Sequence, residues 1–350
     1  MFAKLAPVLA LGLSVAHALT YRGVDWSSVT VEEQSGISYK TVGGVSESLE
    51  KILVANGVNT VRQRIWVNPS DGTYNLAYNV ALAKRAKAVG LGVYLDLHFS
   101  DTWADPGHQA IPSGWPTDID DLSWRLYNYT LQVSDEFQSN GLQPAIISIG
   151  NEITNGLLFP TGSKSSSVYN VARLLHSASA GIKDSTLSPK PKIMIHLDNG
   201  WNWSTQQSWY TSVLAAGPLL TSDFDIMGVS YYPFYNSAAT LSSLKSSLTN
   251  MASTWGKGIV VAETDWPTYC PSPAYAFPSD TTSIPLSPDG QVTWIRDVAS
   301  IVAGIQNGLG LFYWEPAWVT NANLGSSCGY CCMFASSGQA MSGVSVFSSI

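Results

Sequence analysis

The chain has 350 residues, of which 12% are charged and 45% hydrophobic, and its formal net charge is −7 at pH 7. This length suffices for one large barrel or two ordinary domains, and so low a charge content excludes a long disordered protein. The sequence has no cluster of Lys or Arg, which argues against binding to nucleic acid. Its 13 Trp residues instead suit stacking against flat, uncharged ligands.

The N-terminus has the pattern of a secretory signal peptide, residues 1–18. Lys4 supplies the positive start, Leu5–Val15 is an apolar run, and Ala16-His17-Ala18 is a small-residue cleavage pattern. The run is too short to span a bilayer, for which about 20 apolar residues are needed. No later segment of the sequence reaches that length. The sequence therefore predicts a secreted, extracellular protein that is not held in a membrane.

Two further features agree with export. Asn128 and Asn202 each begin an Asn-x-Ser/Thr triplet, the acceptor for an N-linked glycan. The four cysteines, which lie in the last quarter of the chain, predict two disulfides with three possible connectivities. A zinc site is disfavoured, because no histidine follows Asp198 and adjacent cysteines are poorly spaced for tetrahedral ligation. The cysteines are Cys270, Cys328, Cys331 and Cys332.

Short β-type runs alternate with longer helical patterns along the chain. The predicted strands are Tyr21–Trp26, Asn59–Trp66, Gly92–His98, Ala145–Glu152, Lys192–Leu197, Ile226–Tyr232, Gly258–Thr264 and Gly310–Glu315. The predicted helices between them are Ser46–Ala55, Leu76–Val89, Asp121–Ser139, Val168–Lys183, Thr205–Ala215, Leu241–Thr254 and Gln291–Gln306. Asn56-Gly57, Gly90 and Asn307-Gly308 are expected to end helices.

Eight such repeats without a GxGxxG turn favour a closed (β/α)8 barrel, an α/β fold, over an open dinucleotide-binding sheet. No linker rich in Pro, Ser or Gly divides the chain, so residues 19–350 are expected to form one domain. The segment Thr268–Pro288, with five prolines and no periodicity, is predicted to be a long loop. Chemistry in such a barrel belongs at the carboxyl ends of the strands.

Two of the predicted strands end with a glutamate. Asn151-Glu152 closes the fourth strand, and Glu263 lies near the end of the seventh. A single Glu after a strand is usually a solvated loop charge. Two of them on apolar strands, in a chain so poor in charge, indicate a pair of carboxyl groups across a cleft. Glycoside hydrolysis requires such a pair.

Other strand ends add polar and aromatic side chains, as expected of a sugar-binding cleft. Arg62 and Arg64 share one face of the second strand, and either could hold a carboxylate in its ionised form. Further candidates for the cleft are His98, His196, Asp198 and Trp314. Trp103, Trp115, Trp201 and Trp266 could be stacking platforms, or they could brace loops.

The strand-end pattern resembles the clan A retaining glycoside hydrolases, in which Asn-Glu closes strand 4 and a second Glu closes strand 7. Within that clan the sequence closely resembles glycoside hydrolase family 53, the fungal arabinogalactan endo-β-1,4-galactanases. The residues that carry the resemblance run from residue 21 to about 333. They are Arg22-Gly23-Val24-Asp25, Val61–Trp66, Asp96–Asp101, Trp103-Ala104-Asp105-Pro106, Gly150-Asn151-Glu152, Ser230-Tyr231-Tyr232-Pro233, Ala262-Glu263-Thr264 and Tyr313-Trp314-Glu315-Pro316.

The resemblance implies a retaining mechanism with Glu152 as acid/base and Glu263 as nucleophile. Asn151 is expected to bind the sugar 2-hydroxyl, Tyr231 to orient Glu263 by a hydrogen bond, and Arg62 to lie near Glu263. His98, Asp198 and Trp314 complete the implied substrate-binding set. The implied substrate is β-1,4-galactan in the (arabino)galactan side chains of pectin, and the protein is expected to be a monomer without a cofactor.

Bacterial members of this family carry a calcium ion in the loop after strand 7. Asp280 is the only acid in Thr268–Pro288, so we expect no metal here and disulfides in its place. Three other functions fit parts of the pattern less well. A clan A endo-hydrolase of β-mannan, β-glucan or xylan would use the same carboxyls, whereas a catalytically silent sugar-binding barrel would not need them. A nicotinamide-dependent reductase would need a basic pocket that the sequence lacks.

Overall fold

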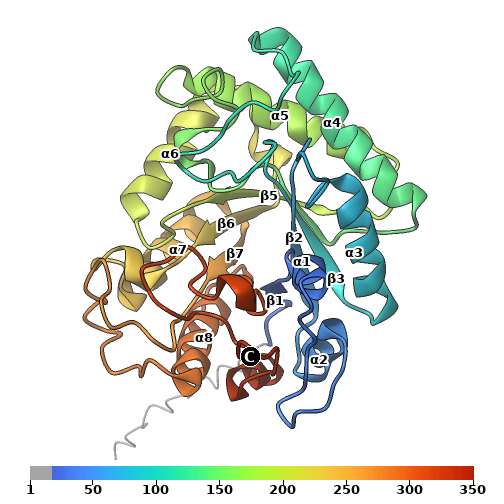
Figure 1. Ribbon diagram of the computed structural model, residues 1–350. Helices are drawn as coiled ribbons and strands as arrows, with labels where there is room; N and C mark the ends of the chain where they lie inside the picture. The colour runs from blue at the N-terminus through green and yellow to red at the C-terminus, as the bar shows by residue number, and fades with distance from the viewer. Residues whose placement is uncertain (1–17) are drawn as a thin grey trace, which may run out of the picture.

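Eight parallel strands form a closed barrel in which each strand pairs with the next and β8 pairs with β1 (Figure 1). The structure is a computed structural model that describes residues 18–350, so the predicted signal peptide lies outside the described residues except for Ala18. The predicted (β/α)8 barrel is confirmed. The strands are β1 (Tyr21–Asp25), β2 (Thr60–Ile65), β3 (Gly92–Leu97), β4 (Ile146–Ser148), β5 (Lys192–Leu197), β6 (Ile226–Ser230), β7 (Gly258–Thr264) and β8 (Gly308–Tyr313).

Helices surround the barrel, and all seven predicted ones are present. They are α2 (Leu49–Ala55), α3 (Leu76–Ala88), α4 (Ile119–Ser139), α5 (Val168–Asp184), α6 (Trp203–Ala216), α7 (Leu241–Trp255) and α8 (Pro288–Ala303). The short α1 (Val29–Gln34) was not predicted, and only 3₁₀ turns follow β8, at Val319–Asn321 and Ser342–Ser349. Within residues 18–350, no helix is both long and apolar enough to cross a membrane.

Glycines end two of the helices as predicted. Gly57 and Gly90 follow α2 and α3 with φ of +91° and +81°, a conformation that glycine adopts without strain. The prediction for Asn307-Gly308 is wrong, because α8 already ends at Ala303 and Gly308 begins β8. Gly308 is needed there for close packing, since a Cβ would lie 1.8 Å from the carbonyl oxygen of Val302.

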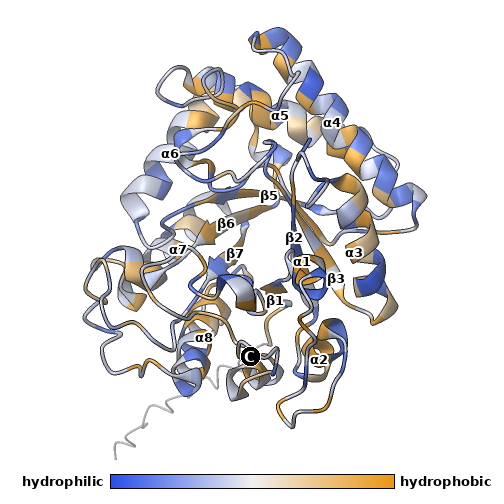
Figure 2. Ribbon diagram, viewed as in Figure 1, coloured by the Kyte–Doolittle hydropathy of each residue, from blue (hydrophilic) through white to orange (hydrophobic). Residues whose placement is uncertain are grey.

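The barrel interior is a packed core rather than a pore. It is filled by buried side chains that come from six different strands: Tyr94, Ile146, Met194, Ile226, Val260, Ala262 and Phe312. A second, larger apolar layer lies between the strands and the amphipathic helices, whose outer faces are hydrophilic (Figure 2). Because the interior is filled, a ligand can reach the barrel axis only at the mouth, where the polar strand ends gather.

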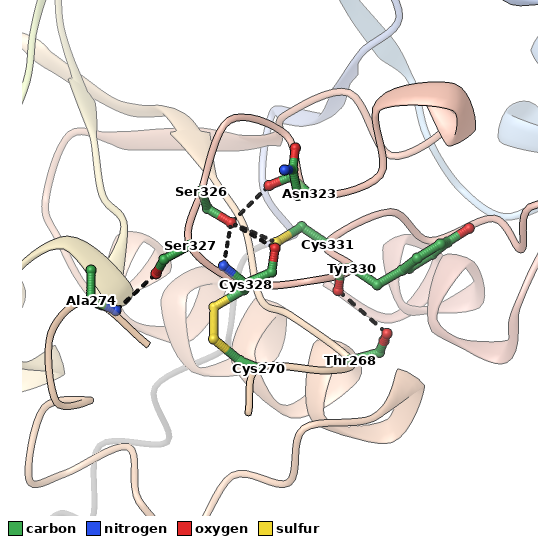
Figure 3. The surroundings of a disulfide bond; sticks show 9 residues. All are labelled: Thr268, Cys270, Ala274, Asn323, Ser326, Ser327, Cys328, Tyr330 and Cys331. Atoms are coloured by element: carbon green, nitrogen blue, oxygen red, sulfur yellow. Dashed lines mark hydrogen bonds between the residues drawn. A yellow bond between two sulfur atoms is a disulfide. The ribbon is translucent and has the colours of Figure 1, made fainter. Parts of the chain in front are cut away.

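The loop after β7 is long, as predicted, and contains no helix or strand between residues 265 and 287. A disulfide between Cys270 and Cys328 ties it to the segment after β8 (Figure 3). The predicted second disulfide is wrong, because Cys331 and Cys332 are free and buried. Their sulfur atoms point to different surroundings: Cys331 Sγ lies 3.6 Å from Ser326 Oγ, and Cys332 Sγ lies 3.3 Å from Trp318 O.

Candidate active site

A cavity of about 490 Å³ opens at the carboxyl ends of the strands. All of the predicted catalytic and substrate-binding residues except Tyr231 line it. These are Arg62, His98, Asn151, Glu152, Asp198, Glu263 and Trp314. The strands of the barrel therefore bring together, at one mouth, side chains that are separated by more than two hundred residues in the sequence.

Glu263 is held by two donors at the end of β7. Arg62 Nη2 lies 2.6 Å from its Oε1, and the Tyr232 hydroxyl donates to its Oε2 at 2.7 Å. Burial raises the pKa of Glu263, and the charge of Arg62 and the Tyr232 hydrogen bond oppose that rise because both stabilise the ionised form. These two contacts therefore favour the ionised form of Glu263 over that of Glu152.

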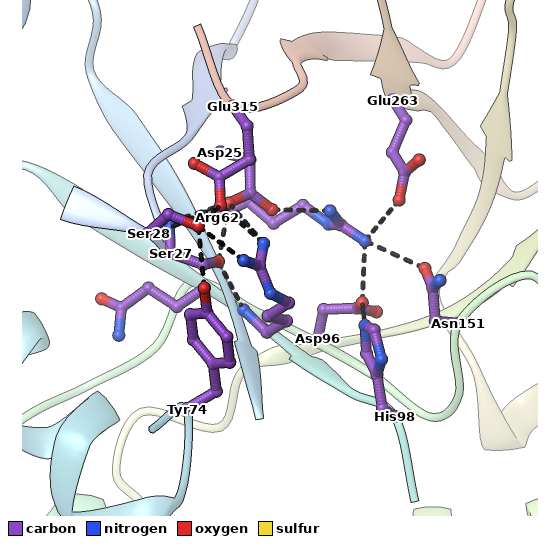
Figure 4. A network of polar contacts seen from close by, with 12 residues as sticks. Asp25, Ser27, Ser28, Arg62, Tyr74, Asp96, His98, Asn151, Glu263 and Glu315 are labelled. Atoms are coloured by element: carbon purple, nitrogen blue, oxygen red, sulfur yellow. Dashed lines mark hydrogen bonds and ion pairs between the residues drawn. The ribbon is translucent and has the colours of Figure 1, made fainter. Parts of the chain in front are cut away.

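Arg62 joins Glu263 to three other strands (Figure 4). Its Nη1 donates to Asp25 Oδ2 at 2.6 Å, and its Nη2 donates to Asp96 Oδ2 at 2.7 Å and Asn151 Oδ1 at 2.9 Å. The guanidinium is buried among these partners, so its position is fixed from β1, β3 and the turn after β4. The prediction that Arg62, rather than Arg64, lies beside Glu263 is confirmed.

Glu152 projects from a sharp turn after β4. Gly150 and Glu152 have φ of +115° and +49°, and a Cβ on Gly150 would lie 2.7 Å from Ile153 Cγ2. A non-glycine residue with positive φ is strained, and such strain concentrates at functional sites. Burial, with the negative charges of Glu263 and Asp198, raises the pKa of Glu152 well above its usual value. Glu263 therefore ionises first, and Glu152 keeps its proton.

The prediction that Tyr231 orients Glu263 is wrong. The Tyr231 hydroxyl donates to the carbonyl of Ala239 at 2.9 Å, and its ring stacks on Trp294 in the layer between barrel and helices. The neighbouring Tyr232 faces the cleft instead. Both tyrosines follow the end of β6, and the backbone at Tyr232 is still extended, so the two adjacent side chains point to opposite sides of the chain.

His98 is uncharged and donates a hydrogen bond to Asp96. Its Nδ1 accepts a hydrogen bond from the Ala104 N–H at 3.1 Å, so the ring proton is on Nε2, which lies 3.0 Å from Asp96 Oδ2. Burial lowers the pKa of His98, which keeps it uncharged. His196 is not in the cleft wall: it is fully buried, with Nε2 2.9 Å from Ser230 Oγ.

Asn151 and Asp198 present polar groups to the cavity. The Asn151 amide donates one hydrogen to Ala104 O at 2.7 Å, which leaves its second hydrogen for a ligand. Asp198 accepts hydrogen bonds from the Thr154 hydroxyl and from Asn199 Nδ2, and burial raises its pKa.

Aromatic rings form one wall of the mouth. Trp103 and Trp314 line the cavity, and Trp103 stacks on Trp318 at a centroid distance of 6.0 Å. The guanidinium of Arg64 lies 4.4 Å from the Trp103 ring and pairs with Glu315 at 2.6 Å, so this second arginine supports the wall rather than a catalytic carboxylate. Of the other proposed platforms, Trp115 and Trp266 are buried outside the cavity, and Trp201 is half-buried and bonded to Asn199.

The sequence of the chain matches the family model described as glycosyl hydrolase family 53 over residues 21–347. The chain belongs to this family. The resemblance on which the catalytic assignments were based is thereby confirmed for nearly the whole described chain.

Fungal proteins match this chain over nearly their whole length. The chain is 67% identical to the arabinogalactan endo-β-1,4-galactanase of Thermothelomyces thermophilus, over 95% of this chain and 100% of that one. It is 62% identical to the protein of the same name from Humicola insolens, over 94% of this chain and 99% of that one. A solved fungal β-1,4-galactanase structure superposes with a TM-score of 0.94 at 67% identity, covering 95% of this chain and 100% of the other.

The structure of this family 53 protein places three further residues at the site for which the sequence analysis predicted no role. Tyr232 bonds to Glu263, Trp318 backs the aromatic wall, and Asp265 lines the cavity beside Glu263. A possible signal for Asp265 was its spacing, because it lies two residues after Glu263 and so on the same side of the chain. Nothing in the sequence separates Tyr232 from Tyr231.

Proposed function

We propose that this protein is a secreted endo-β-1,4-galactanase that cleaves (arabino)galactan side chains of pectin with retention of configuration. The names of its family 53 relatives support the substrate. The observation that carries the mechanism is the unequal surroundings of the two carboxyls: Arg62 and Tyr232 contact Glu263, and burial beside two acids keeps the proton on Glu152. The enzyme acts as a monomer and needs neither a metal nor another cofactor.

The first step is a displacement at the anomeric carbon. A Glu263 oxygen forms a bond to that carbon while the bond to the leaving sugar breaks, and the Glu152 proton moves to the leaving oxygen. The result is a galactosyl ester on Glu263 and an ionised Glu152. In the second step Glu152 takes a proton from water, the water oxygen attacks the anomeric carbon, and Glu263 leaves as a carboxylate. Two inversions give net retention.

The remaining cavity residues hold the galactan chain. The free amide hydrogen of Asn151 donates to the 2-hydroxyl of the sugar at Glu263, and His98 fixes Asp96 and through it Arg62. Asp198 binds hydroxyl groups on the Glu152 side of the mouth. Trp103 and Trp314 stack on the flat faces of the sugar rings.

The substrate is tested by incubating the protein with unbranched β-1,4-galactan, arabinogalactan, β-mannan, β-glucan and xylan. We expect short galacto-oligosaccharides from the two galactans and no products from the other three polymers. The Glu263→Gln variant, which keeps the shape of the side chain but not its charge, serves as the inactive control. Faster cleavage of mannan, glucan or xylan than of galactan would reassign the enzyme to another endo-hydrolase specificity.

A further inference from the structure

Outside the cleft, and sharing no lining residue with it, an exposed aromatic cluster lies on the outer wall of the barrel. Helices α4 and α5 lie side by side there (Figure 1), and a groove of about 380 Å³ runs between them. Trp124 and Tyr169 in this groove are 65% and 51% exposed. All 13 tryptophans lie within residues 18–350, and Trp124 alone among them is exposed. An exposed Trp beside an exposed Tyr needs an explanation, because large aromatic side chains are usually covered.

The groove has the chemistry of a sugar-binding surface. Tyr127 packs edge-on against Trp124 at a centroid distance of 5.7 Å, and its hydroxyl donates to Asp184 at 3.0 Å. Arg173 and His176 add polar groups along the same groove. Flat rings beside hydrogen-bonding side chains fit the faces and hydroxyls of an uncharged sugar.

The chain carries its own sugar acceptor at this place. Asn128 begins an Asn-x-Thr triplet and lies on the exposed face of α4, four residues after Trp124. Side chains four apart are neighbours about 6 Å from each other on a helix surface. Helical side chains also lean toward the helix N-terminus, so a group on Asn128 extends over the turn that bears Trp124.

We propose that an N-linked glycan on Asn128 folds back over Trp124 and fills the groove between α4 and α5. The inference rests on export, which is part of the proposed function. An oligosaccharide passes from a lipid diphosphate to Asn128 Nδ2: the new bond joins nitrogen to the anomeric carbon, Nδ2 loses a proton, and the lipid diphosphate leaves. Thr130 is buried in folded α4, where its hydroxyl donates to Tyr127 O, so the transfer precedes folding.

The first experiment compares the accessibility of Trp124 in proteins secreted by a fungal host. Peptide mass spectrometry shows whether Asn128 is occupied, and acrylamide quenching of tryptophan fluorescence measures exposure. We expect stronger quenching in Asn128→Gln than in the wild type, and no such difference between the same pair in a Trp124→Phe background. Ser204→Ala is an exposed change that removes the other acceptor without touching the Asn202 side chain that caps α6. It should leave unchanged the part of the quenching that depends on Trp124, measured as the difference from the same protein with Trp124→Phe.

The second experiment is a double-mutant cycle of melting temperatures. Asn128→Gln should lower Tm by roughly 1–3 °C in the wild type, as expected for one stacking contact in a chain of this size. It should have no such effect in Trp124→Ala. In unglycosylated protein from a bacterial host, Asn128→Gln should not lower Tm, because Gln is the better helix former.

Several results would overturn the inference. An unmodified Asn128 in protein recovered from the medium, or equal quenching with and without its glycan, would leave the groove without this occupant while the proposed activity stands. Retention of inactive Glu263→Gln/Asn128→Gln protein in a galactan-containing gel, abolished by Trp124→Ala, would assign the groove to the substrate instead. Protein that remains inside the cells would contradict export itself, which is a failure of the proposed function.

Discussion

At the scale of single residues, the site depends on which of two adjacent tyrosines faces the cleft. The five residues of β6 are all buried, because a barrel strand has packed neighbours on both faces. Hydrophobic alternation therefore cannot tell inside from outside in this strand. The pairing of β6 with β7 also shifts register between Val229 and Ser230, just before the two tyrosines. The type of residue could be predicted from the sequence, but the direction of its side chain could not.

Tyr232 contacts Glu263 and Tyr231 does not, so removing each hydroxyl in turn gives a test variant and its control. Tyr232→Phe removes a hydrogen bond that stabilises ionised Glu263, so the pKa of Glu263 should rise and the acidic limb of the kcat/KM profile should move to higher pH. We expect kcat to fall about tenfold or more, as for the loss of a hydrogen bond to a charged group. The measurement is the pH dependence of galactan hydrolysis.

Tyr231→Phe is the control for this experiment. It removes the buried hydrogen bond to Ala239 and should lower the free energy of unfolding by about 1 kcal/mol. The acidic limb should stay where it is. Equal shifts of that limb in both variants would show that the Tyr232 hydroxyl does not tune Glu263.

The roles of the two carboxyls can be separated with azide. Glu152→Ala should still form the Glu263 ester from an aryl galactoside with a good leaving group, and azide should convert that ester to a β-galactosyl azide. Glu263→Ala with azide should give the α-azide, because the anion then replaces the nucleophile and only one inversion occurs. Proton NMR of the products distinguishes the two anomers. An α-azide from Glu152→Ala would exchange the assigned roles.

At the scale of elements, the strands were predictable as short apolar runs, and the long helices as longer segments that lie between these runs. The ends of elements were less so: β4 covers only Ile146–Ser148 of the predicted Ala145–Glu152. The missing part is the turn in which Gly150 and Glu152 adopt positive φ, and local propensity does not predict strained backbone in a non-glycine residue. Phe99, Asn199 and Glu315, which follow other strands, have positive φ as well. The departures from regular structure thus lie at the catalytic mouth.

The disulfide gives a prediction at this scale. Cys270 and Cys328 are separated by 58 residues, so the bond constrains the unfolded chain, and bonds of this kind typically contribute ~2–4 kcal/mol. Cys270→Ser/Cys328→Ser should therefore lower the melting temperature. Thiol titration of the wild type supplies the check: two cysteines should react, and only after unfolding. Four reactive thiols would contradict the disulfide.

Dialysis against a chelator should change neither stability nor activity. A large loss of either would contradict the metal-free assignment.

At the scale of the whole molecule, buried acids determine how stability varies with pH. Asp265 is 1% exposed, and neither of its carboxyl oxygens accepts a well-formed hydrogen bond from the described residues, because the nearby Trp314 N–H donates to Thr264 O. Burial raises its pKa well above the usual value, so the unfolded chain releases this proton first and stability falls as pH rises past about 4. Asp96 acts in the opposite sense. Its pKa is lowered to about 2 because burial is outweighed by Arg62 and His98, so its contribution is lost as pH falls from about 4 toward 2.

Asp265→Asn tests this account, because the amide keeps the shape of the side chain but does not titrate. We expect the variant to lose less melting temperature than the wild type between pH 5 and pH 8. The exposed Asp280→Asn serves as the control and should leave the slope unchanged. A wild-type Tm that is flat over this range, or an unchanged slope in Asp265→Asn, would show that Asp265 has a partner in the folded protein.

The contacts of Arg62 also bear on which small molecules should inhibit the enzyme. One guanidinium serves three carboxylates, from Asp25, Asp96 and Glu263, so the floor of the mouth holds more negative than positive charge. Ester formation on Glu263 removes one of these charges, and the positive charge that develops on the sugar ring as the glycosidic bond breaks is attracted to the others. A sugar analogue with a protonated ring nitrogen imitates that charge. We therefore expect galactose-shaped iminosugars to bind this site more tightly than neutral galactosides of the same size.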